Sequence, residues 1–286
     1  MTVSGQRPVC IMKTAATPIG KELPMRKSVL VTGATNGTGY AIARRFAAEN
    51  YDVFICSRSG EAAAAAAKAL MEEFPVQAVG YETKIFDEEN VKAIFADIRS
   101  RGYLLDVLVL NAANLGIGQV SLEVNIQDFM NVFNTNIGWN FLMAREAAKQ
   151  MKEKEKGSIV FIASNSGLRV TENRCAYCSS KSAILAMSKS FAVDWGQYGI
   201  RSNCVLPGMI KTERWQNNVN NSKSYLANYT PLRDIAEFED VANAAWFFGS
   251  DQSRNTTGAE LTVDGGMLAQ LTPNLSKKPV WMDEGE

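Results

Sequence analysis

The chain has 286 residues, 46% of them hydrophobic and 21% charged, and its 30 lysine and arginine side chains balance its 30 aspartate and glutamate side chains. This composition is typical of a globular protein with a sizeable core, and the lack of a basic surplus argues against a protein that binds nucleic acid or anionic membranes. The chain contains no histidine, so it has neither an imidazole for acid–base catalysis nor a histidine ligand for zinc.

Short apolar segments alternate with longer helix-like segments along the sequence. Strands are expected at 27–32, 52–57, 76–81, 107–110, 158–162, 201–205 and 260–263. Helices are expected from the glycine-rich turn after the first strand to residue 50, and at 61–74, 88–101, 126–154, 177–198 and 240–248. Continuous apolar strands that alternate with helices indicate a parallel sheet covered on both faces. The sequence therefore predicts one α/β domain of the Rossmann type, a doubly wound parallel sheet of about seven strands with helices on both faces.

The expected domain covers 27–269, between an N-terminal extension (1–26) and a C-terminal tail (270–286) that contain prolines and few apolar residues. We expect these tails to be arms or partly disordered. No segment has the ~20 apolar residues of a membrane-spanning helix, and the N-terminal extension does not resemble a signal peptide. The five cysteines are scattered, which does not fit a disulfide framework and favours a reducing, cytoplasmic location.

A glycine-rich turn lies between the first predicted strand and its helix. Its small and polar residues include Gly33, Thr35, Asn36, Gly37, Thr38 and Gly39. Small residues let the backbone approach a pyrophosphate, whose negative charge is favoured at a helix N-terminus. A purely structural turn is the alternative, but the position after the first strand of an alternating pattern favours dinucleotide binding.

The spacing Gly-x-x-x-Gly-x-Gly resembles the short-chain dehydrogenase/reductase family in its compact single-domain branch, and the resemblance extends from Lys27 to Met267. It implies an NAD(P)-dependent enzyme that acts on ketones or alcohols, similar to 3-oxoacyl-ACP reductases and hydroxysteroid dehydrogenases. The second strand ends in Ser57 and Arg58 rather than in an acidic residue. Because arginine can bind a phosphate bidentately, we expect NADP(H) to be preferred over NAD(H), unless Arg58 is only a solvated surface residue.

Tyr177 and Lys181 lie four residues apart, on one face of a predicted helix. A tyrosine has a pKa of about 10, which a nearby positive charge lowers. Lys181 and an oxidised nicotinamide would therefore let Tyr177 exchange a proton with the substrate. Ser164 follows a predicted strand at the family's spacing before Tyr177. The resemblance makes Ser164 the group that holds the substrate oxygen, with Ser166 as a local alternative.

The resemblance also assigns residues elsewhere in the chain. Asn136 matches the fourth catalytic member, which the family joins to its lysine through water in a proton relay; a solvated helix asparagine is the alternative. Lys84 stands where the family often has an aspartate that holds adenine, so only a backbone contact is expected nearby. The implied cofactor contacts beyond the glycine turn are Ser57, Arg58, Ile85, Asn111, Ala112, Tyr177, Lys181, Pro207, Gly208, Ile210 and Thr212.

A mostly apolar substrate pocket is expected, and segment 211–234 is expected to form a lid over it. A β-ketoacyl thioester, a steroid-like ketone and a small cyclic ketone would all fit such a pocket. The resemblance further implies a homotetramer or homodimer formed through the long helices near Asn136 and Tyr177. The expected substrate contacts are Ser164, Leu168, Tyr177, Met209 and Trp215.

Cys175 and Cys178 bracket Tyr177. A metal site is not expected there, because the chain has no histidine and no second cysteine pair. We expect both cysteines to be small pocket-lining or buried residues. Their oxidation is expected to affect the active site, because they lie close to Tyr177 in the sequence.

Two alternatives to an oxidoreductase are compatible with a dinucleotide-binding fold. One is a regulatory protein that binds the dinucleotide without turnover, and the other is a sugar epimerase or dehydratase. The glycine spacing and the lack of a large C-terminal substrate region argue against the second. The presence of a complete catalytic set argues against the first: Asn136, Ser164, Tyr177 and Lys181.

Overall fold

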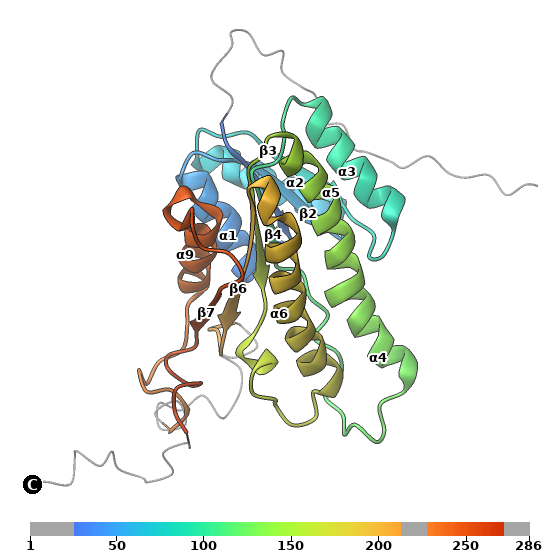
Figure 1. The fold of residues 1–286 in the computed structure, drawn as a ribbon, viewed down its shortest axis with the longest axis vertical. Helices are drawn as coiled ribbons and strands as arrows, with labels where there is room; N and C mark the ends of the chain where they lie inside the picture. The colour runs from blue at the N-terminus through green and yellow to red at the C-terminus, as the bar shows by residue number, and fades with distance from the viewer. Residues whose placement is uncertain (1–25, 213–227, 272–286) are drawn as a thin grey trace, which may run out of the picture.

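A single seven-stranded sheet forms the centre of the molecule (Figure 1). The computed structural model describes residues 26–212 and 228–271. All pairings are parallel and the strand order is β3-β2-β1-β4-β5-β6-β7. The strands are β1 (Ser28–Thr32), β2 (Asp52–Ser57), β3 (Ala78–Glu82), β4 (Val107–Leu110), β5 (Gly157–Ile162), β6 (Ile200–Pro207) and β7 (Glu260–Val263). This confirms the predicted doubly wound parallel sheet.

Helices cover both faces of the sheet because its strands are apolar on both sides. Within β1, Val29 and Val31 pack into one core layer with α1, α2 and α9, whereas Leu30 packs into the other with α3, α5 and α6. None of the helices in the described parts of the chain is long and apolar enough to cross a membrane. The α-helices of the described residues are α1 (Gly37–Ala48), α2 (Gly60–Glu73), α3 (Glu88–Ser100), α4 (Ile126–Phe133), α5 (Asn140–Glu153), α6 (Cys175–Trp195) and α9 (Phe238–Gly249).

The predicted long helix over 126–154 differs from the observed structure. A π-helical segment, Asn134–Trp139, separates α4 from α5. The side chain of Asn136 in this segment is buried and bonds both backbone groups of Asn114, accepting from its N–H at 2.7 Å and donating to its carbonyl at 3.0 Å. Single π turns inside α-helices are frequent at functional sites. The other elements agree with their predicted positions to within about three residues, as expected for helix and strand ends.

The domain division remains a prediction. The expected tails, 1–26 and 270–286, fall almost entirely outside the described residues.

The strand order places a crevice at the carboxyl ends of β1 and β4. The chain extends from β1 through β2 to β3 on one side and then crosses to β4 on the other. Loops that leave β1 and β4 in opposite directions open a crevice between them, and open α/β sheets bind their ligands at such a point. The topology thus sets the location of the candidate site.

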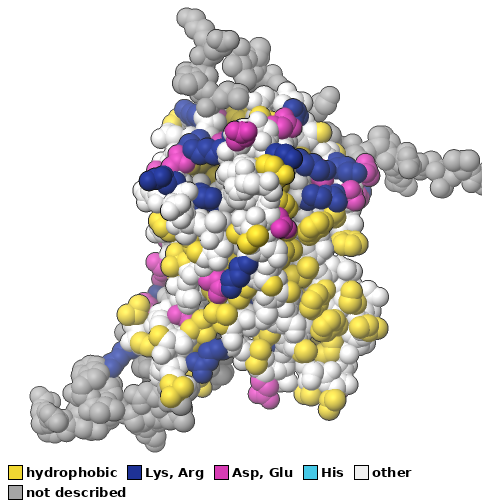
Figure 2. Space-filling view, in the orientation of Figure 1, with side chains coloured by type: hydrophobic (Ala, Val, Ile, Leu, Met, Phe, Trp, Pro, Cys, Tyr) yellow, Lys and Arg dark blue, Asp and Glu magenta, His cyan; other side chains and the backbone are white. Residues whose placement is uncertain are grey.

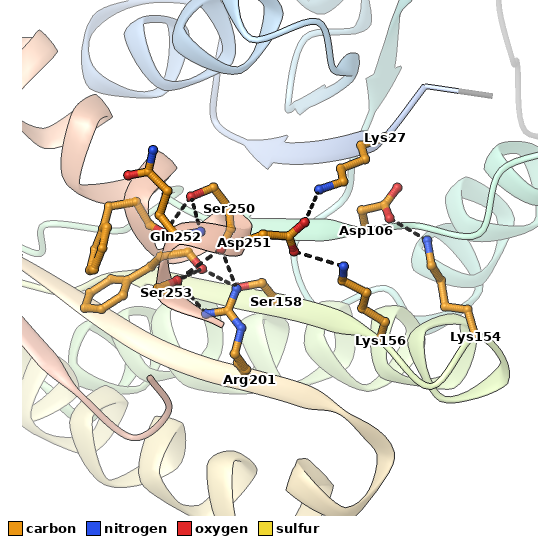
Figure 3. Close-up of polar contacts among 12 residues, drawn as sticks. Lys27, Asp106, Lys154, Lys156, Ser158, Arg201, Ser250, Asp251, Gln252 and Ser253 are labelled. Carbon is orange, nitrogen blue, oxygen red and sulfur yellow. Dashed lines mark hydrogen bonds and ion pairs between the residues drawn. The ribbon is translucent and has the colours of Figure 1, made fainter. Parts of the chain in front are cut away.

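A network of charged groups lies at the opposite end of the sheet (Figure 3). Asp251 accepts from Lys27 at 2.6 Å and from Lys156 at 2.9 Å, and these two lysines lower the pKa of its carboxyl to about 2. Arg201, at the start of β6, donates instead to neutral oxygens, the Ser253 hydroxyl at 2.7 Å and the Ser250 carbonyl at 3.1 Å.

Arg201→Met is expected to lower the free energy of unfolding by about 1–3 kcal/mol, because it leaves part-buried acceptors without their donor. Lys156→Met is the matched control. Its ion pair with Asp251 is exposed, so its loss should cost less than about 1 kcal/mol. Urea denaturation of the two variants measures the difference. Equal destabilisation would contradict the structural role given to Arg201.

Candidate active site

The glycine-rich turn after β1 allows close backbone packing at the N-terminus of α1. Gly33 has a φ of +63°, and a Cβ atom there would lie 3.1 Å from Ala112. A Cβ atom on Gly39 would overlap the Gly33 carbonyl and the Asn111 amide. No side-chain hydrogen bond from the N-cap residue Asn36 caps α1. The first turn of this helix therefore has N–H groups suited to an anion such as a pyrophosphate.

Asn111 ties the glycine turn to the end of β4. Its side-chain amide donates to the carbonyls of Thr32 and Gly33, at 3.0 and 3.1 Å. The hydroxyl of Thr32 in turn accepts from the backbone N–H groups of Asn111 and Ala112, both at 3.0 Å. The two loops that border the crevice are thus held together by direct hydrogen bonds.

A cavity of about 920 Å³ opens along the carboxyl ends of the strands. It is lined by twelve of the predicted cofactor residues: Gly33, Thr35, Asn36, Gly37, Thr38, Gly39, Ser57, Arg58, Ile85, Asn111, Ala112 and Thr212. Sequence reasoning missed other lining residues, namely Cys56, Thr83, Ala113, Asn114, Leu115, Thr135, Trp139 and Phe238. Thr83 directly follows β3, and this position at the end of a strand could have predicted that it lines the cavity. Phe238 comes from the distant start of α9 and had no local signal.

Among the described residues that line this cavity, Arg58 is the single charged one. Its side chain is exposed, and no carboxylate pairs with it within the described ranges. The preceding Ser57 hydroxyl accepts from the Ser59 N–H at 3.4 Å. An exposed guanidinium at the end of β2 can bind a phosphate group. The residues present thus fit a dinucleotide.

Ser164 and Tyr177 meet at the carboxyl end of β5. The Ser164 hydroxyl caps the short 3₁₀ turn η2 (Asn165–Gly167) by accepting from the Ser166 N–H at 3.1 Å. Burial raises the pKa of Tyr177 above its ordinary value, while the adjacent Ser164 hydroxyl and the Arg174 guanidinium oppose this rise. The Ser166 hydroxyl contacts Thr171 instead, at 3.4 Å. The structure therefore brings Ser164, rather than Ser166, next to the tyrosine.

Lys181 lies buried beneath the tyrosine ring. Its Nζ donates to the carbonyl of Ile162 at 2.8 Å and is 5.7 Å from the centre of the Tyr177 ring. Burial lowers the pKa of Lys181 to about 8. In the protein without a cofactor, burial of the Tyr177 side chain is the largest influence on its pKa, and the net effect is a rise. The lowering expected from Lys181 is therefore not seen in this state.

Asn136 connects the π-helical segment with the helix that carries Tyr177. Its side-chain N–H donates to the Ser180 hydroxyl at 2.9 Å, and this hydroxyl donates to the Tyr177 carbonyl at 2.7 Å. Asn136 is completely buried, so its alternative interpretation as a solvated asparagine is wrong. Its backbone carbonyl accepts from Asn140 at 2.8 Å. A water-mediated relay to Lys181 stays a prediction.

The segment after β6 packs against the chain that follows β7. The Gly208 N–H donates to the Val263 carbonyl at 2.9 Å, and a Cβ atom on Gly208 would lie 2.6 Å from that of Asp264. Ile210 forms an isolated bridge with Ala236. Among the predicted contacts of this segment, Thr212 lines the cavity, whereas Pro207, Gly208 and Ile210 do not.

The predicted substrate contacts are only partly described. Leu168 is exposed and Met209 is half-buried, and neither lines the cavity described above. Trp215 and most of the expected lid lie outside the described residues.

Known proteins resemble this chain over most of its length. A family model described as enoyl-(acyl carrier protein) reductase matches residues 33–268. The 3-oxoacyl-[acyl-carrier-protein] reductase FabG of Chlamydia trachomatis is 31% identical over 245 residues, which is 86% of this chain and 98% of the relative. The chain belongs to the short-chain dehydrogenase/reductase family. This family assignment confirms the resemblance drawn from the glycine spacing.

Solved structures of this family support the same fold and cofactor class. ElxO with NADP bound has a TM-score of 0.79 at 32% identity, covering 86% of this chain and all (100%) of its own. NAD⁺-bound xylitol dehydrogenase has a TM-score of 0.77 at 27% identity, covering 85% of this chain and 100% of its own. As a short-chain dehydrogenase/reductase, the chain is an NAD(P)-dependent oxidoreductase that acts on CH–OH or keto groups. Its cofactor is a nicotinamide dinucleotide.

Proposed function

We propose that the protein is an NADP(H)-dependent oxidoreductase that interconverts a ketone and a secondary alcohol, with Tyr177 as its proton-transfer group. One observation carries this proposal. Ser164, Tyr177 and the buried Lys181 converge at the carboxyl ends of the strands, where sheets of this topology bind their ligands.

Each polar group in this set has a separate role in the proposed reaction. The reduced nicotinamide, when bound, supplies a hydride to the carbonyl carbon. The Ser164 hydroxyl holds the carbonyl oxygen and stabilises the charge that develops on it. Tyr177 gives its phenolic proton to that oxygen, or takes a proton from the alcohol in the reverse direction. The Lys181 ammonium favours the resulting phenolate.

Asn136 acts as a positioning residue in this proposal. Its hydrogen bond to Ser180, and that of Ser180 to the Tyr177 carbonyl, brace the first turn of α6 from the π-helical segment. Such bracing holds a proton donor in its productive geometry.

A preference for NADP(H) over NAD(H) follows from the charge of the cavity lining. Arg58 is the one charged residue in the described part of that lining, and it would bind the 2′-phosphate, beside Ser57. We assign the pyrophosphate to the turn 33–39, the adenine end to Ile85 and the ribose to Asn111 and Ala112. The nicotinamide end would contact Tyr177, Lys181 and the segment from Pro207 to Thr212.

Arg58→Asp is expected to weaken NADPH binding by about 10–100-fold, since a charge-assisted hydrogen bond contributes roughly 1.5–3 kcal/mol. NADH binding should change little, because its ribose carries no phosphate. Fluorescence titration with both cofactors measures the change. Lys68→Asp makes the same charge change at an exposed position of α2 and should leave the preference unaltered. If Arg58→Asp also left it unaltered, Arg58 would not bind the phosphate.

We propose a lipophilic ketone as the substrate. A 3-oxoacyl thioester is the first to test, because the FabG relative is named for such a substrate; a steroid-like ketone and a small cyclic ketone complete the panel. Consumption of NADPH with any of them supports the proposal. Binding of NADPH without turnover across the panel would favour the regulatory alternative.

We also propose a homo-oligomer and a reducing, cytoplasmic location. Figure 2 shows hydrophobic side chains gathered over the side where α4 and α5 lie. Exposed apolar residues of these helices and of α6 include Ile126, Met130, Phe141 and Val193, and exposed apolar patches of this kind mark contact surfaces. The four described cysteines are free thiols, as expected in a reducing compartment.

Phe141→Glu is expected to shift the protein toward smaller species, because it places a charge in the proposed contact between copies. Light scattering after size-exclusion chromatography measures the mass. Met71→Glu is the matched control, since Met71 is a similarly exposed apolar residue on α2, away from this side. An unchanged mass for Phe141→Glu would exclude this face as the contact.

A further inference from the structure

Two thiols flank Tyr177 in the first turn of α6. Cys175 is the first residue of this helix and is exposed, whereas Cys178 is the fourth and is buried. The Cys178 sulfur accepts from the Thr171 N–H at 3.5 Å, in the loop that leads into the helix. Residues three apart lie on the same side of a helix. The Cβ atoms of the two cysteines are therefore neighbours, with the proposed proton donor between them in sequence.

The other described cysteines are in a different environment. Cys56 and Cys204 lie in the core, and burial raises the pKa of each thiol to about 12. Reactive cysteines in proteins are partly exposed and lie at helix N-termini or beside basic side chains. Cys175 combines these features, because it is exposed, begins α6 and follows Arg174. An exposed cysteine with a second thiol close by is the usual arrangement in redox-sensitive sites.

Helix geometry brings the pair within reach of a disulfide, but only if the first turn distorts. Residues i and i+3 of an α-helix have Cα atoms about 5 Å apart, which lies inside the range of roughly 4.4–6.8 Å seen for disulfides. Their Cβ atoms are about 5–6 Å apart, whereas a disulfide needs about 3.5–4.5 Å. Closing the bond therefore has to tighten the turn that contains Tyr177.

This turn is at the end of the helix, where distortion breaks few contacts. Arg174 provides no side-chain cap, and the backbone bond from Cys178 to the Arg174 carbonyl, at 2.9 Å, is the first one of α6. Tyr177 lies within that single turn, and its position relative to Ser164 depends on it. A shift of about 1 Å at a catalytic group can cost 10²-fold in rate.

We propose that Cys175 and Cys178 are a redox modification site, in which a reversible disulfide displaces Tyr177 and switches the reductase off. Hydrogen peroxide oxidises the Cys175 thiol to a sulfenic acid and releases one water. The Cys178 thiol then attacks the sulfenic sulfur, forming the S–S bond and releasing a second water. A dithiol reductant restores both thiols by exchange and is itself oxidised to a disulfide. The inhibitory effect, though not the disulfide itself, rests on the proposed role of Tyr177.

Peptide mapping of the full-length chain tests the modification directly. Trypsin cleaves after Arg174 and Lys181, so one peptide, 175–181, contains both cysteines. After peroxide treatment this peptide is expected to lose two hydrogens in mass, and dithiothreitol should return them. If the peptide kept both hydrogens under conditions that oxidise an exposed control thiol, the proposal would be overturned. This readout needs neither cofactor nor substrate.

Activity measured on the same samples tests the switch. Ketone reduction by NADPH is expected to fall by about 10²-fold in parallel with the disulfide and to return with dithiothreitol. Cys178→Ser should be active and form no disulfide in peptide 175–181, whereas Cys10→Ser should behave as the natural chain does. A complete disulfide with undiminished turnover would overturn the switch. A reduced natural chain without any ketone turnover would instead refute the proposed function, whatever its thiols do.

Discussion

Tyr177→Phe is expected to bind NADPH almost as tightly as the natural chain while ketone reduction falls by about 10²–10⁴-fold, the usual contribution of a general acid. The substitution keeps the ring, whose centre lies 5.8 Å from the Arg174 guanidinium and 5.7 Å from the Lys181 ammonium. It removes only the phenolic hydroxyl. Lys181 keeps its own anchor, because it donates to the Ile162 carbonyl rather than to the phenol. Fluorescence titration and steady-state rates measure binding and turnover separately.

Tyr198→Phe is the matched control for this variant. Tyr198 follows the same helix at its other end, in the 3₁₀ turn η3 (Gly196–Tyr198), and its ring packs under Lys152 at 4.1 Å. Loss of its hydroxyl should leave turnover unchanged. Turnover by Tyr177→Phe at the rate of this control would show that the phenol transfers no proton.

Lys181→Met is expected to have the second largest effect, a loss of about 10²-fold or more in turnover, because it removes the positive charge that favours the phenolate. It should also change the pH dependence of alcohol oxidation. Without the ammonium, ionisation of Tyr177 costs more, so the rise of the rate with pH should move to higher pH. In the natural chain burial lowers the pKa of Lys181 to about 8. Its supporting charge is therefore present at neutral pH and is lost as the pH rises through about 8.

Lys189→Met provides the comparison on the same helix. Lys189 pairs with Glu260 at 2.6 Å and its side chain is largely exposed, so turnover and its pH profile should be those of the natural chain. A pH profile that moved equally in both variants would mean that general surface charge, not the buried ammonium, sets the ionisation of Tyr177.

The sheet, the helices and most of the residues that line the crevice were predictable from local sequence. Apolar runs such as Val107–Leu110 can be buried only between two helical layers, and Gly33 and Gly39 stand where a larger residue would meet the neighbouring loop. These signals are local because they reflect backbone conformation and strand burial. They placed the crevice at the correct ends of the strands.

The structure differs from the predictions where segments that are distant in the sequence contact one another. The π-helical turn depends on the hydrogen bonds of Asn136 to the Asn114 backbone. Helical periodicity alone predicted one continuous helix across this segment. Burial is the largest influence on the pKa of Tyr177 in the protein without a cofactor, and local sequence does not show how far a side chain is buried. Phe238 reaches the cavity from α9, which no nearby motif indicates.

The fate of the hydride tests the central claim most directly. NADPH that carries deuterium at the transferred position is incubated with the protein and each ketone of the panel, and the products are analysed by mass spectrometry. The proposed function predicts that one ketone at least yields an alcohol with one deuterium on its carbinol carbon, and that Tyr177→Phe forms this product far more slowly. The proposed function would be contradicted if NADPH bound but no product carried deuterium. It would also be contradicted if the natural chain and Tyr177→Phe formed the labelled alcohol at the same rate.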